Sequence, residues 1–479
     1  MRSPYFPARS VLFHKEPSGV TYRVPALLYL SRFRSFLAFC EERLTPSDSQ
    51  AHLLVMRKGT FYRNYVEWKD MRVLGTALLP GHRSMNPCPV YDEFTGILFL
   101  FFIAVLGHTS ESYQLVTGDN VTRLCYISST DGGDTWSPAT DLTEAVIGGT
   151  IKDWATFALG PGHGIQLKSG RLLIPAYAYH IDCRECFGQL CLTTPRAFCF
   201  HSDTHGRSWR FGEPIPAPES VECQMVSVDE EDGSNVLYCN ARSPLGYRVQ
   251  ALSLDDGAVF QEGQLVQSLV EPRNGCHGSV VGFPAPLRPC EAHGGRRPPC
   301  RHWTSLMGPT DRSHSAPRPD FLTPTWVVYS HPTWSTARRD LGVFLSLFPR
   351  DPDSWRGPWV IYEGPSAYSD LAYLELSPSP GEPPAVAFAC LFECGTKTAY
   401  DEICFSVFSL YELINNLPGA AAEPRTNRRE NETQQADCEM GGEHEPRNAP
   451  VVHQMAHVKK KKKKKRRRRR KLMKMCFVS

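Results

Sequence analysis

Three copies of one eight-residue pattern constrain the fold of this chain more than any other sequence feature. Residues 129–136 (STDGGDTW) have the form S-x-D-x-G-x-T-W. Residues 202–209 (SDTHGRSW) repeat it with Thr in place of Asp, and residues 253–260 (SLDDGAVF) are a third, decayed copy. Asp and Gly suit tight turns between strands, because Asp accepts bonds from backbone N–H groups and Gly tolerates positive φ. The copies start 73 and 51 residues apart, which suits one four-stranded propeller blade each.

The segments between these turns have the character of strands. Apolar or alternating runs at Ile97–Leu106, 172–179, 236–241 and 326–330 are bounded by Gly, Pro, Asp or Ser, and no long helical periodicity interrupts them. We therefore expect an all-β body from residue 10 to about 408.

One short helix is expected to close this body. Ser409 and Glu412 form a capping-box pattern, and Pro418-Gly419 stops the helix. Its predicted apolar face consists of Leu410, Leu413, Ile414 and Leu417.

Two stretches depart from the strand pattern. Residues 288–322 are rich in Pro, Arg and Gly and predict a flexible insertion within a body at 1–418. Residues 419–479 are polar and low in complexity, which favours a disordered tail. Residues 459–471 are 13 consecutive basic residues, and outside them 40 basic residues face 50 acidic ones. The basic charge therefore belongs to the tail and says nothing about the substrate of the body.

The chain carries no recognisable export or membrane-spanning segment. Its first residues lack the apolar stretch of a secretory signal, and the longest apolar run, Ile97–Leu106, is half the length that a spanning helix needs. An odd number of cysteines, 17, favours a reducing compartment. We expect a cytoplasmic protein or one bound to a membrane peripherally.

Several longer motifs, taken together, resemble those of one known family. The eight-residue copies resemble the Asp boxes of the sialidase family, and four further segments match that family in order: 22–25 (YRVP), 81–89 (GHRSMNPCP), 154–163 (WATFALGPGH) and 367–371 (AYSDL). Segments 184–188, 243–246 and 363–365 resemble most the fourth, membrane-associated vertebrate paralogue. The resemblance covers roughly residues 10–415 and implies a six-bladed β-propeller with exo-α-sialidase activity.

A sialic acid substrate is expected to be bound by arginine side chains. Sialic acid carries a carboxylate on the carbon that is attacked, and the planar guanidinium binds carboxylates through two charge-assisted hydrogen bonds. The resemblance implies that Arg23, Arg242 and Arg338 form the family's arginine triad. For the third position, Arg338 matches the family better than its neighbour Arg339.

The substrate charge also bears on the nucleophile. A carboxylate nucleophile at ~4 Å from the substrate carboxylate would be repelled by about 4 kcal/mol at an effective dielectric of ~20. A neutral tyrosine avoids this cost, and sialidases are the known tyrosine exception among retaining glycosidases. By resemblance Tyr368 is the nucleophile, Glu222 takes its proton, and Asp48 is the acid and then the base.

The remaining site residues also come from the resemblance. Arg43 and Glu393 should orient the arginine triad, and Tyr177 and Tyr179 should line the pocket for the glycerol chain. Pocket residues near the N-acyl and glycerol groups are expected to be Met85, Asn86 and Glu111. No cofactor or metal is required.

Two positions depart from the family or suggest another chemistry. His277 stands where the family usually has Gln, which predicts a change in specificity or pH dependence, or no change if one hydrogen bond is kept. His180, Cys183, Cys186 and Cys191 have a spacing that could bind zinc, but no second cysteine pair completes a familiar module.

The expected partners are sialylated gangliosides, glycoproteins and oligosaccharides. The alternatives are a non-catalytic, sialic-acid-binding propeller and an interaction protein that acts through its insertion and tail. The basic run lacks interleaved aromatic residues, so we expect no nucleic-acid binding but nuclear localisation or attraction to an anionic membrane. Cys476, four residues from the end in Cys-Phe-Val-Ser, fits a prenylation signal.

Overall fold

The computed structural model describes residues 5–62, 65–184, 191–286, 323–376 and 385–418. These residues all belong to one compact unit, Met1–Glu423. The predicted insertion at 288–322 and the predicted tail at 419–479, with its basic run and Cys476, lie outside the described residues.

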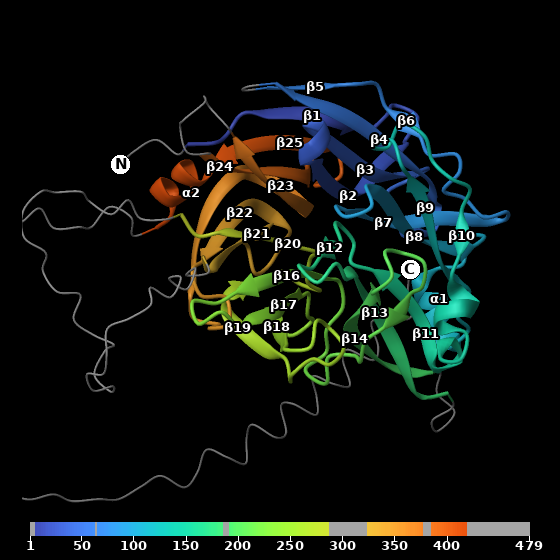
Figure 1. The fold of residues 1–479 in the computed structure, drawn as a ribbon. Coiled ribbons are helices and arrows are strands. Elements are labelled where there is room, and N and C mark those ends of the chain that lie inside the picture. The colour runs from blue at the N-terminus through green and yellow to red at the C-terminus, as the bar shows by residue number, and fades with distance from the viewer. Residues whose placement is uncertain (1–4, 63–64, 185–190, 287–322, 377–384, 419–479) are drawn as a thin grey trace, which may run out of the picture. The chain divides into compact units, whose positions relative to one another are not determined.

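The described strands form five antiparallel sheets, arranged around a common centre like the blades of a propeller (Figure 1). The first sheet contains β2 (Thr21–Leu30), β3 (Ser35–Arg43), β4 (Ala51–Tyr62), β5 (Tyr65–Trp68) and β6 (Arg72–Val73). The second contains β7 (His82–Asp92), β8 (Ile97–Leu106), β9 (Thr122–Ser129) and β10 (Thr140–Asp141). The third sheet contains β11 (Trp154–Leu159), β12 (Ile165–Gln166), β13 (Leu172–Cys183), β14 (Leu192–Ser202) and β15 (Arg210–Phe211). The fourth contains β16 (Cys223–Asp229), β17 (Asn235–Ala241), β18 (Tyr247–Ser253) and β19 (Gln264–Val270). The all-β expectation is confirmed.

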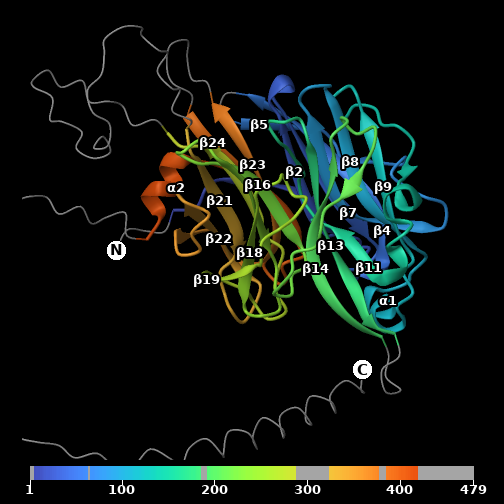
Figure 2. The ribbon, with the colours of Figure 1, turned by 60° about the horizontal axis from the view of Figure 1, so that its bottom comes forward.

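The fifth sheet is larger because one strand serves two neighbours. Its members are β20 (Ser279–Pro284), β21 (Thr325–Pro332), β22 (Arg339–Ser346), β23 (Trp355–Leu376), β24 (Ala385–Cys394), β25 (Glu402–Ser409) and β1 (Arg9–His14). The first half of β23 pairs with β22 and its second half, from Ser366, pairs with β24. Strand β1 pairs with β25, so the two ends of the body meet in one sheet (Figure 1). In Figure 2, β21, β22, β23 and β24 of this sheet lie side by side.

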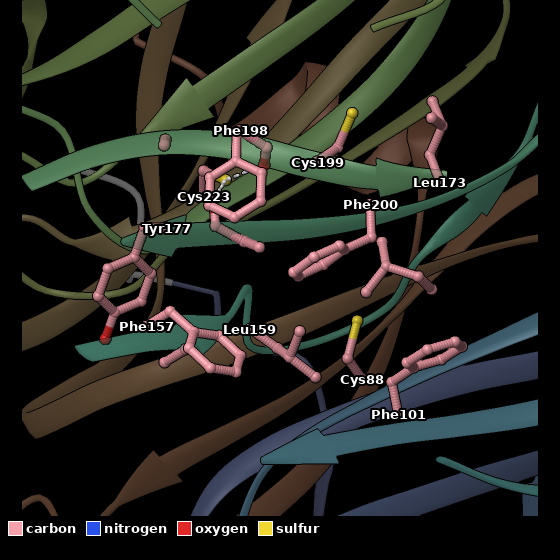
Figure 3. Packing of buried hydrophobic residues seen from close by; sticks show 14 of the residues in the cluster. Cys88, Phe101, Phe157, Leu159, Leu173, Tyr177, Phe198, Cys199, Phe200 and Cys223 are labelled. Carbon is pink, nitrogen blue, oxygen red and sulfur yellow. Dashed lines mark hydrogen bonds between the residues drawn. The ribbon is translucent and has the colours of Figure 1, made fainter. Parts of the chain in front are cut away.

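The innermost strands of successive sheets contact one another. Strand β2 contacts β7, β7 contacts β11 and β13, β13 contacts β16, β16 contacts β20, β20 contacts β23, and β23 returns to β2. Together they form a closed ring around the centre. Between neighbouring sheets the core is packed with aromatic and aliphatic side chains, such as Phe101, Phe157, Phe198 and Phe200 (Figure 3).

The three repeated octets make the same turn. In the first, Gly133 N donates to Ser129 Oγ (2.9 Å) and Thr135 N to Asp131 Oδ1 (2.9 Å). The third copy repeats both bonds through Ser253 and Asp255 at 2.9 Å.

In the second copy Thr204 Oγ1 takes the place of the carboxylate and accepts from Ser208 N (2.8 Å). The aromatic ring that follows packs inward, where Trp209 is 6% exposed and contacts Phe101. The second copy therefore keeps the turn because a hydroxyl replaces the carboxylate as acceptor, and the third keeps it because Asp255 is retained.

The C-terminal helix is confirmed with one correction. Helix α2 (Leu410–Asn416) begins with a complete capping box between Ser409 and Glu412. Leu410, Leu413 and Leu417 are buried, but Ile414 is 39% exposed. The prediction that Ile414 belongs to the apolar face is wrong. The buried face of this short helix is a single stripe at positions i, i+3 and i+7, and Ile414 lies outside it. None of the described helices is long and apolar enough to cross a membrane.

A second short helix was not expected from the sequence. Helix α1 (Glu111–Thr117) is capped at its start by Ser110, whose side chain accepts from Tyr113 N, and ends at Gly118 with φ 73°. About two helical turns carry too weak a periodicity to be recognised in a β-rich sequence.

A buried aspartate joins the inner strands at the centre. Asp370, 0% exposed on β23, accepts from Leu27 N of β2 (2.7 Å) and from Ser279 Oγ of β20 (2.8 Å). It also accepts from His163 N (3.0 Å) and is paired with His163 Nδ1 (2.7 Å). One carboxylate therefore ties four separate segments together.

We predict that Asp370→Ala destabilises the folded body by roughly 3–5 kcal/mol, because several buried donors lose their acceptor together. The measurement is denaturant unfolding followed by tryptophan fluorescence. Asp70→Ala, at an exposed aspartate, is the control and should change stability by no more than about 0.5 kcal/mol. Equal stability of the two variants would show that Asp370 does not hold the centre together.

Candidate active site

A single cavity of about 750 Å³ collects most of the residues singled out in the sequence. Twelve of the thirteen predicted site residues line it: Arg23, Arg43, Asp48, Met85, Asn86, Glu111, Tyr177, Tyr179, Glu222, Arg242, Arg338 and Tyr368. The thirteenth, Glu393, is fully buried beside it. These residues come from five different sheets or the loops that leave them, so their meeting is a property of the closed ring.

Three guanidinium groups surround Tyr368. Arg23 and Arg338 lie over its ring, with guanidinium carbons 5.5 and 5.3 Å from the ring centroid. Arg242 Nη1 donates to the Tyr368 hydroxyl at 3.1 Å. The arrangement produces a strongly positive patch at one wall of the cavity, suited to a carboxylate.

Glu393 positions both Arg23 and Tyr368. Its carboxylate accepts from Arg23 Nε (2.8 Å) and Arg23 Nη2 (3.4 Å), and also from the backbone N–H of Tyr368 (3.1 Å). The same carboxylate accepts from Val24 N (2.9 Å), where the backbone has the unusual φ of 59°. A buried acid thus fixes the arginine and the tyrosine relative to each other.

Two consecutive carbonyls hold the other arginines. Asn274 O accepts from Arg242 Nη2 (2.5 Å) and Gly275 O from Arg338 Nη2 (3.0 Å). Gly275 has φ 70°, and a Cβ there would lie 2.8 Å from the Arg242 side chain. Glycine is therefore required at this point of close approach.

The Tyr368 hydroxyl donates a hydrogen bond to Glu222 Oε1. Burial, together with the negative charge of Glu222, raises the pKa of Tyr368 well above its ordinary value. Burial by itself would raise the pKa of Glu222, but the Arg242 guanidinium at 2.7 Å and the other donors hold it below its usual range. The resting pair is therefore a neutral phenol beside an ionised carboxylate.

Asp48 also lines the cavity, and its side chain is 69% exposed. Arg43 Nη1 donates to Asp48 Oδ1, and Arg43 is fixed in turn by Glu41 at 2.6 Å. Loss of water on the pocket side would raise the pKa of Asp48, but Arg43 and then Arg23 bring it below its ordinary value. A ligand carboxylate bound at the arginines would offset the charge of Arg23.

Another wall is aromatic and acidic. Tyr177 and Tyr179 project from β13 with ring centroids 6.0 Å apart. Glu111 begins α1. The pocket walls displace water around its carboxyl and, with the charges of Asp48 and Glu222, raise its pKa to about 7. This wall offers hydroxyl and carboxyl groups to a polyhydroxylated ligand.

Shifts in strand register and a positive φ angle orient several of the side chains that line the cavity. The pairing of β2 with β3 shifts register between Arg23 and Ala26, and that of β7 with β8 between Met85 and Cys88. Within β7, Asn86 has φ 54° and its N–H donates to Glu41 Oε1 (2.7 Å). β-Bulges of this kind redirect side chains near functional sites.

Tyr400 is a pocket residue that sequence reasoning missed. The Arg23 guanidinium carbon lies 3.9 Å from its ring centroid, and Arg338 Nη1 donates to its hydroxyl at 3.3 Å. Glu41, Arg83, Gln114 and Asn274 also line the cavity without having been predicted. Only the closeness of Glu41 to Arg43 and Asp48 along the chain could have drawn attention to any of them.

His277, for which the sequence left a change in specificity or pH dependence and no change both open, does not line the cavity. It is fully buried and packs against Tyr368 with ring centroids 5.2 Å apart. Its Nε2 donates to Pro161 O (2.8 Å), and burial lowers its pKa to about 4. His277 is therefore a neutral support behind the tyrosine.

The spacing that suggested zinc is not assembled by the residues that the structure describes. His180 packs its ring against Trp154, and Cys183 is disulfide-bonded. Cys186 lies outside the described residues. The residues described as lining the cavity include no cysteine or histidine, the ligands that transition metals prefer.

Comparisons with known proteins agree with this geometry. A family described as BNR repeat-like domain matches residues 35–288. Human Sialidase-4 is 47% identical over 475 residues, covering 88% of this chain and 97% of that protein. Human Sialidase-3 is 44% identical over 423 residues, covering 87% and 96%.

A solved structure, the Hadza microbial sialidase Hz136, superposes with a TM-score of 0.63 at 20% identity, covering 85% of this chain and 69% of that one. This likeness supports the propeller-like fold. The expected resemblance to the fourth vertebrate paralogue is also confirmed by the match to Sialidase-4. The chain therefore belongs to the sialidase family, a family of exo-α-sialidases.

Proposed function

We propose that this protein removes terminal sialic acid from gangliosides, glycoproteins and oligosaccharides with retention of configuration, using Tyr368 as the nucleophile. The observation that carries the proposal is the Tyr368 hydroxyl. It donates to the ionised Glu222 while three arginines surround the ring. A lectin would need the arginines alone, whereas a base bonded to a buried phenol serves catalysis.

The first step is capture of the substrate carboxylate by Arg23, Arg242 and Arg338. Each already has a fixed acceptor, in Glu393, Asn274 O or Gly275 O, so little side-chain freedom is lost on binding. The aromatic and acidic wall of Tyr177, Tyr179 and Glu111 would face the glycerol chain. Met85 and Asn86 would lie near the N-acyl group.

In the first displacement the Tyr368 oxygen attacks C2 while its proton passes to Glu222, and Asp48 protonates the leaving oxygen as its bond to C2 breaks. In the second, Asp48 takes a proton from the water that attacks C2, the bond from C2 to Tyr368 breaks, and Glu222 returns the proton to the tyrosine oxygen. Two displacements at one carbon give retention. The substrate carboxylate, by offsetting the charge of Arg23, favours the protonated form of Asp48 that the first displacement needs.

We also propose that the scaffold is a six-bladed propeller within a catalytic domain at 1–418. The support is the closed ring of β2, β7, β13, β16, β20 and β23, in which β11 pairs with β13 and also contacts β7. The seven-stranded sheet then counts as two blades that share β23. The three octets, with their shared turn, would be Asp boxes.

Tyr368→Phe should abolish turnover of a fluorogenic sialoside while leaving inhibitor binding and the melting temperature largely unchanged. Loss of a nucleophile costs several decades in kcat, so retention of more than about a tenth of the activity would contradict the assignment. Tyr373→Phe is a matched control, because Tyr373 lies on the same strand and its hydroxyl donates to Glu375, which does not line the cavity. It should keep normal activity.

Arg242→Lys and Arg338→Lys keep the charge but lose the planar fork. Binding of a carboxylated transition-state analogue, measured by calorimetry, should weaken by roughly 1–3 kcal/mol in each variant. Arg339→Lys is the neighbouring control, since Arg339 is 43% exposed and does not line the cavity. Unchanged affinity in both test variants would place the carboxylate elsewhere.

The tail is proposed to attach the enzyme to anionic membranes, which would bring it to gangliosides. Residues 459–471 supply the charge and Cys476 a site for a prenyl chain, two signals that together suffice for anchoring. Cell fractionation should move Cys476→Ser, and more completely a chain ending at Val458, from the membrane to the soluble fraction. Equal distribution of all three proteins would refute the role of the tail.

A further inference from the structure

A cluster of sulfur and carboxylate ligands lies at the base of the hairpin formed by β24 and β25. Cys394 ends β24, Glu402 begins β25, and Cys404 follows two residues later. The sulfurs of Cys394 and Cys404 are 3.1 Å apart, and Cys404 Sγ lies 3.7 Å from Glu402 Oε2. The three ligand atoms all lie within 4.8 Å of one another.

The strand register explains this convergence. Cys394 stands opposite Glu402, and Cys404 stands opposite Phe392. Residues two apart on a strand share a face, so all three ligands project from the same face of the hairpin. Glu393, between Phe392 and Cys394, points the other way and holds Arg23 and Tyr368. The cluster is therefore separate from the cavity but shares its supporting strand.

The cluster combines buried sulfur ligands with a route from solvent. Both sulfurs are buried and Glu402 is half-buried. Arg9 is a basic group whose charge acts on Cys394, but its guanidinium lies over the Tyr362 ring at 4.9 Å. Two buried thiols and one half-buried carboxylate form a mixed sulfur and oxygen ligand set of the kind that Zn²⁺ binds.

The spacing fits a tetrahedral metal better than a disulfide. With Zn–S bonds of about 2.3 Å, two tetrahedral thiolates lie about 3.8 Å apart, and a sulfur and a carboxylate oxygen about 3.6 Å. The observed separations are 3.1 and 3.7 Å. A disulfide would need the sulfurs to close to about 2.05 Å and would leave Glu402 without a role.

We propose that Cys394, Cys404 and Glu402 bind one thiophilic divalent cation of the Zn²⁺ class, with water as the fourth ligand. Binding displaces the two thiol protons to solvent. The metal joins the two strands whose connecting loop, residues 395–401, brings Tyr400 to Arg23 and Arg338. Its role is structural, and it does not depend on the proposed catalytic roles of Tyr368, Glu222 or Asp48.

The test uses the full chain, purified without a histidine tag, reduced and stripped of metal with a chelator. Co²⁺ is titrated in, and the near-ultraviolet thiolate-to-cobalt charge-transfer band reports sulfur ligation. Wild type should bind one equivalent with this band, and Zn²⁺ should abolish the band by displacement. Cys394→Ser and Cys404→Ser should lose it, and Glu402→Gln should bind more weakly. Cys390→Ser, at another buried cysteine of β24, is the matched control and should keep it.

Thermal unfolding gives a second readout that does not rely on the spectrum. Zn²⁺ should raise the melting temperature of wild type and Cys390→Ser but not of Cys404→Ser, because a ligand stabilises the state that binds it. Circular dichroism establishes that each variant is folded. The proposal is overturned by a folded wild type without the band, by a band that persists in both cysteine variants, or by mass spectrometry showing a bond between Cys394 and Cys404 in the reduced preparation.

Discussion

The carboxylate of Asp370 is the interaction on which the rest of the structure depends. It is fully buried at the centre and accepts hydrogen bonds from β2, β20 and the segment at His163. A propeller closes only if its inner strands meet at one axis, and a single acceptor with several donors sets that meeting point. Tyr368 lies two residues away on the same strand, so the position of the candidate nucleophile follows from the closure of the ring.

Around this centre, buried charges are placed in pairs that also build the cavity. Glu393 satisfies Arg23, Glu222 satisfies Arg242, and Glu41 satisfies Arg43. A buried ion is costly without a partner, so each acid that supports the fold also orients an arginine for a ligand. Tyr368 is therefore a neutral side chain surrounded by three arginines and a glutamate. A carboxylate in its place would meet repulsion from any acidic substrate.

Backbone conformation completes the site where regular strands could not. Val24 and Asn86 have positive φ within or beside register shifts of inner strands, and each donates its N–H to a buried glutamate. These bonds, to Glu393 and Glu41, compensate for the strain of a left-handed conformation in a residue with a Cβ. Part of the support of the pocket is thus built into the inner strands β2 and β7 rather than into loops.

The sequence by itself determined the β-rich class, the capped C-terminal helix and the repeated turns, because these rest on local periodicity and on side-chain bonds spanning a few residues. Family motifs also identified the residues that line the cavity. Tertiary structure alone decided that Tyr400 covers Arg23, that His277 lies behind Tyr368 rather than in the pocket, and that Ile414 faces solvent. It alone brought Asp370 to the centre and set Cys394 against Cys404. These contacts join segments through strand register and ring closure, which depend on the whole chain and leave no local pattern to read.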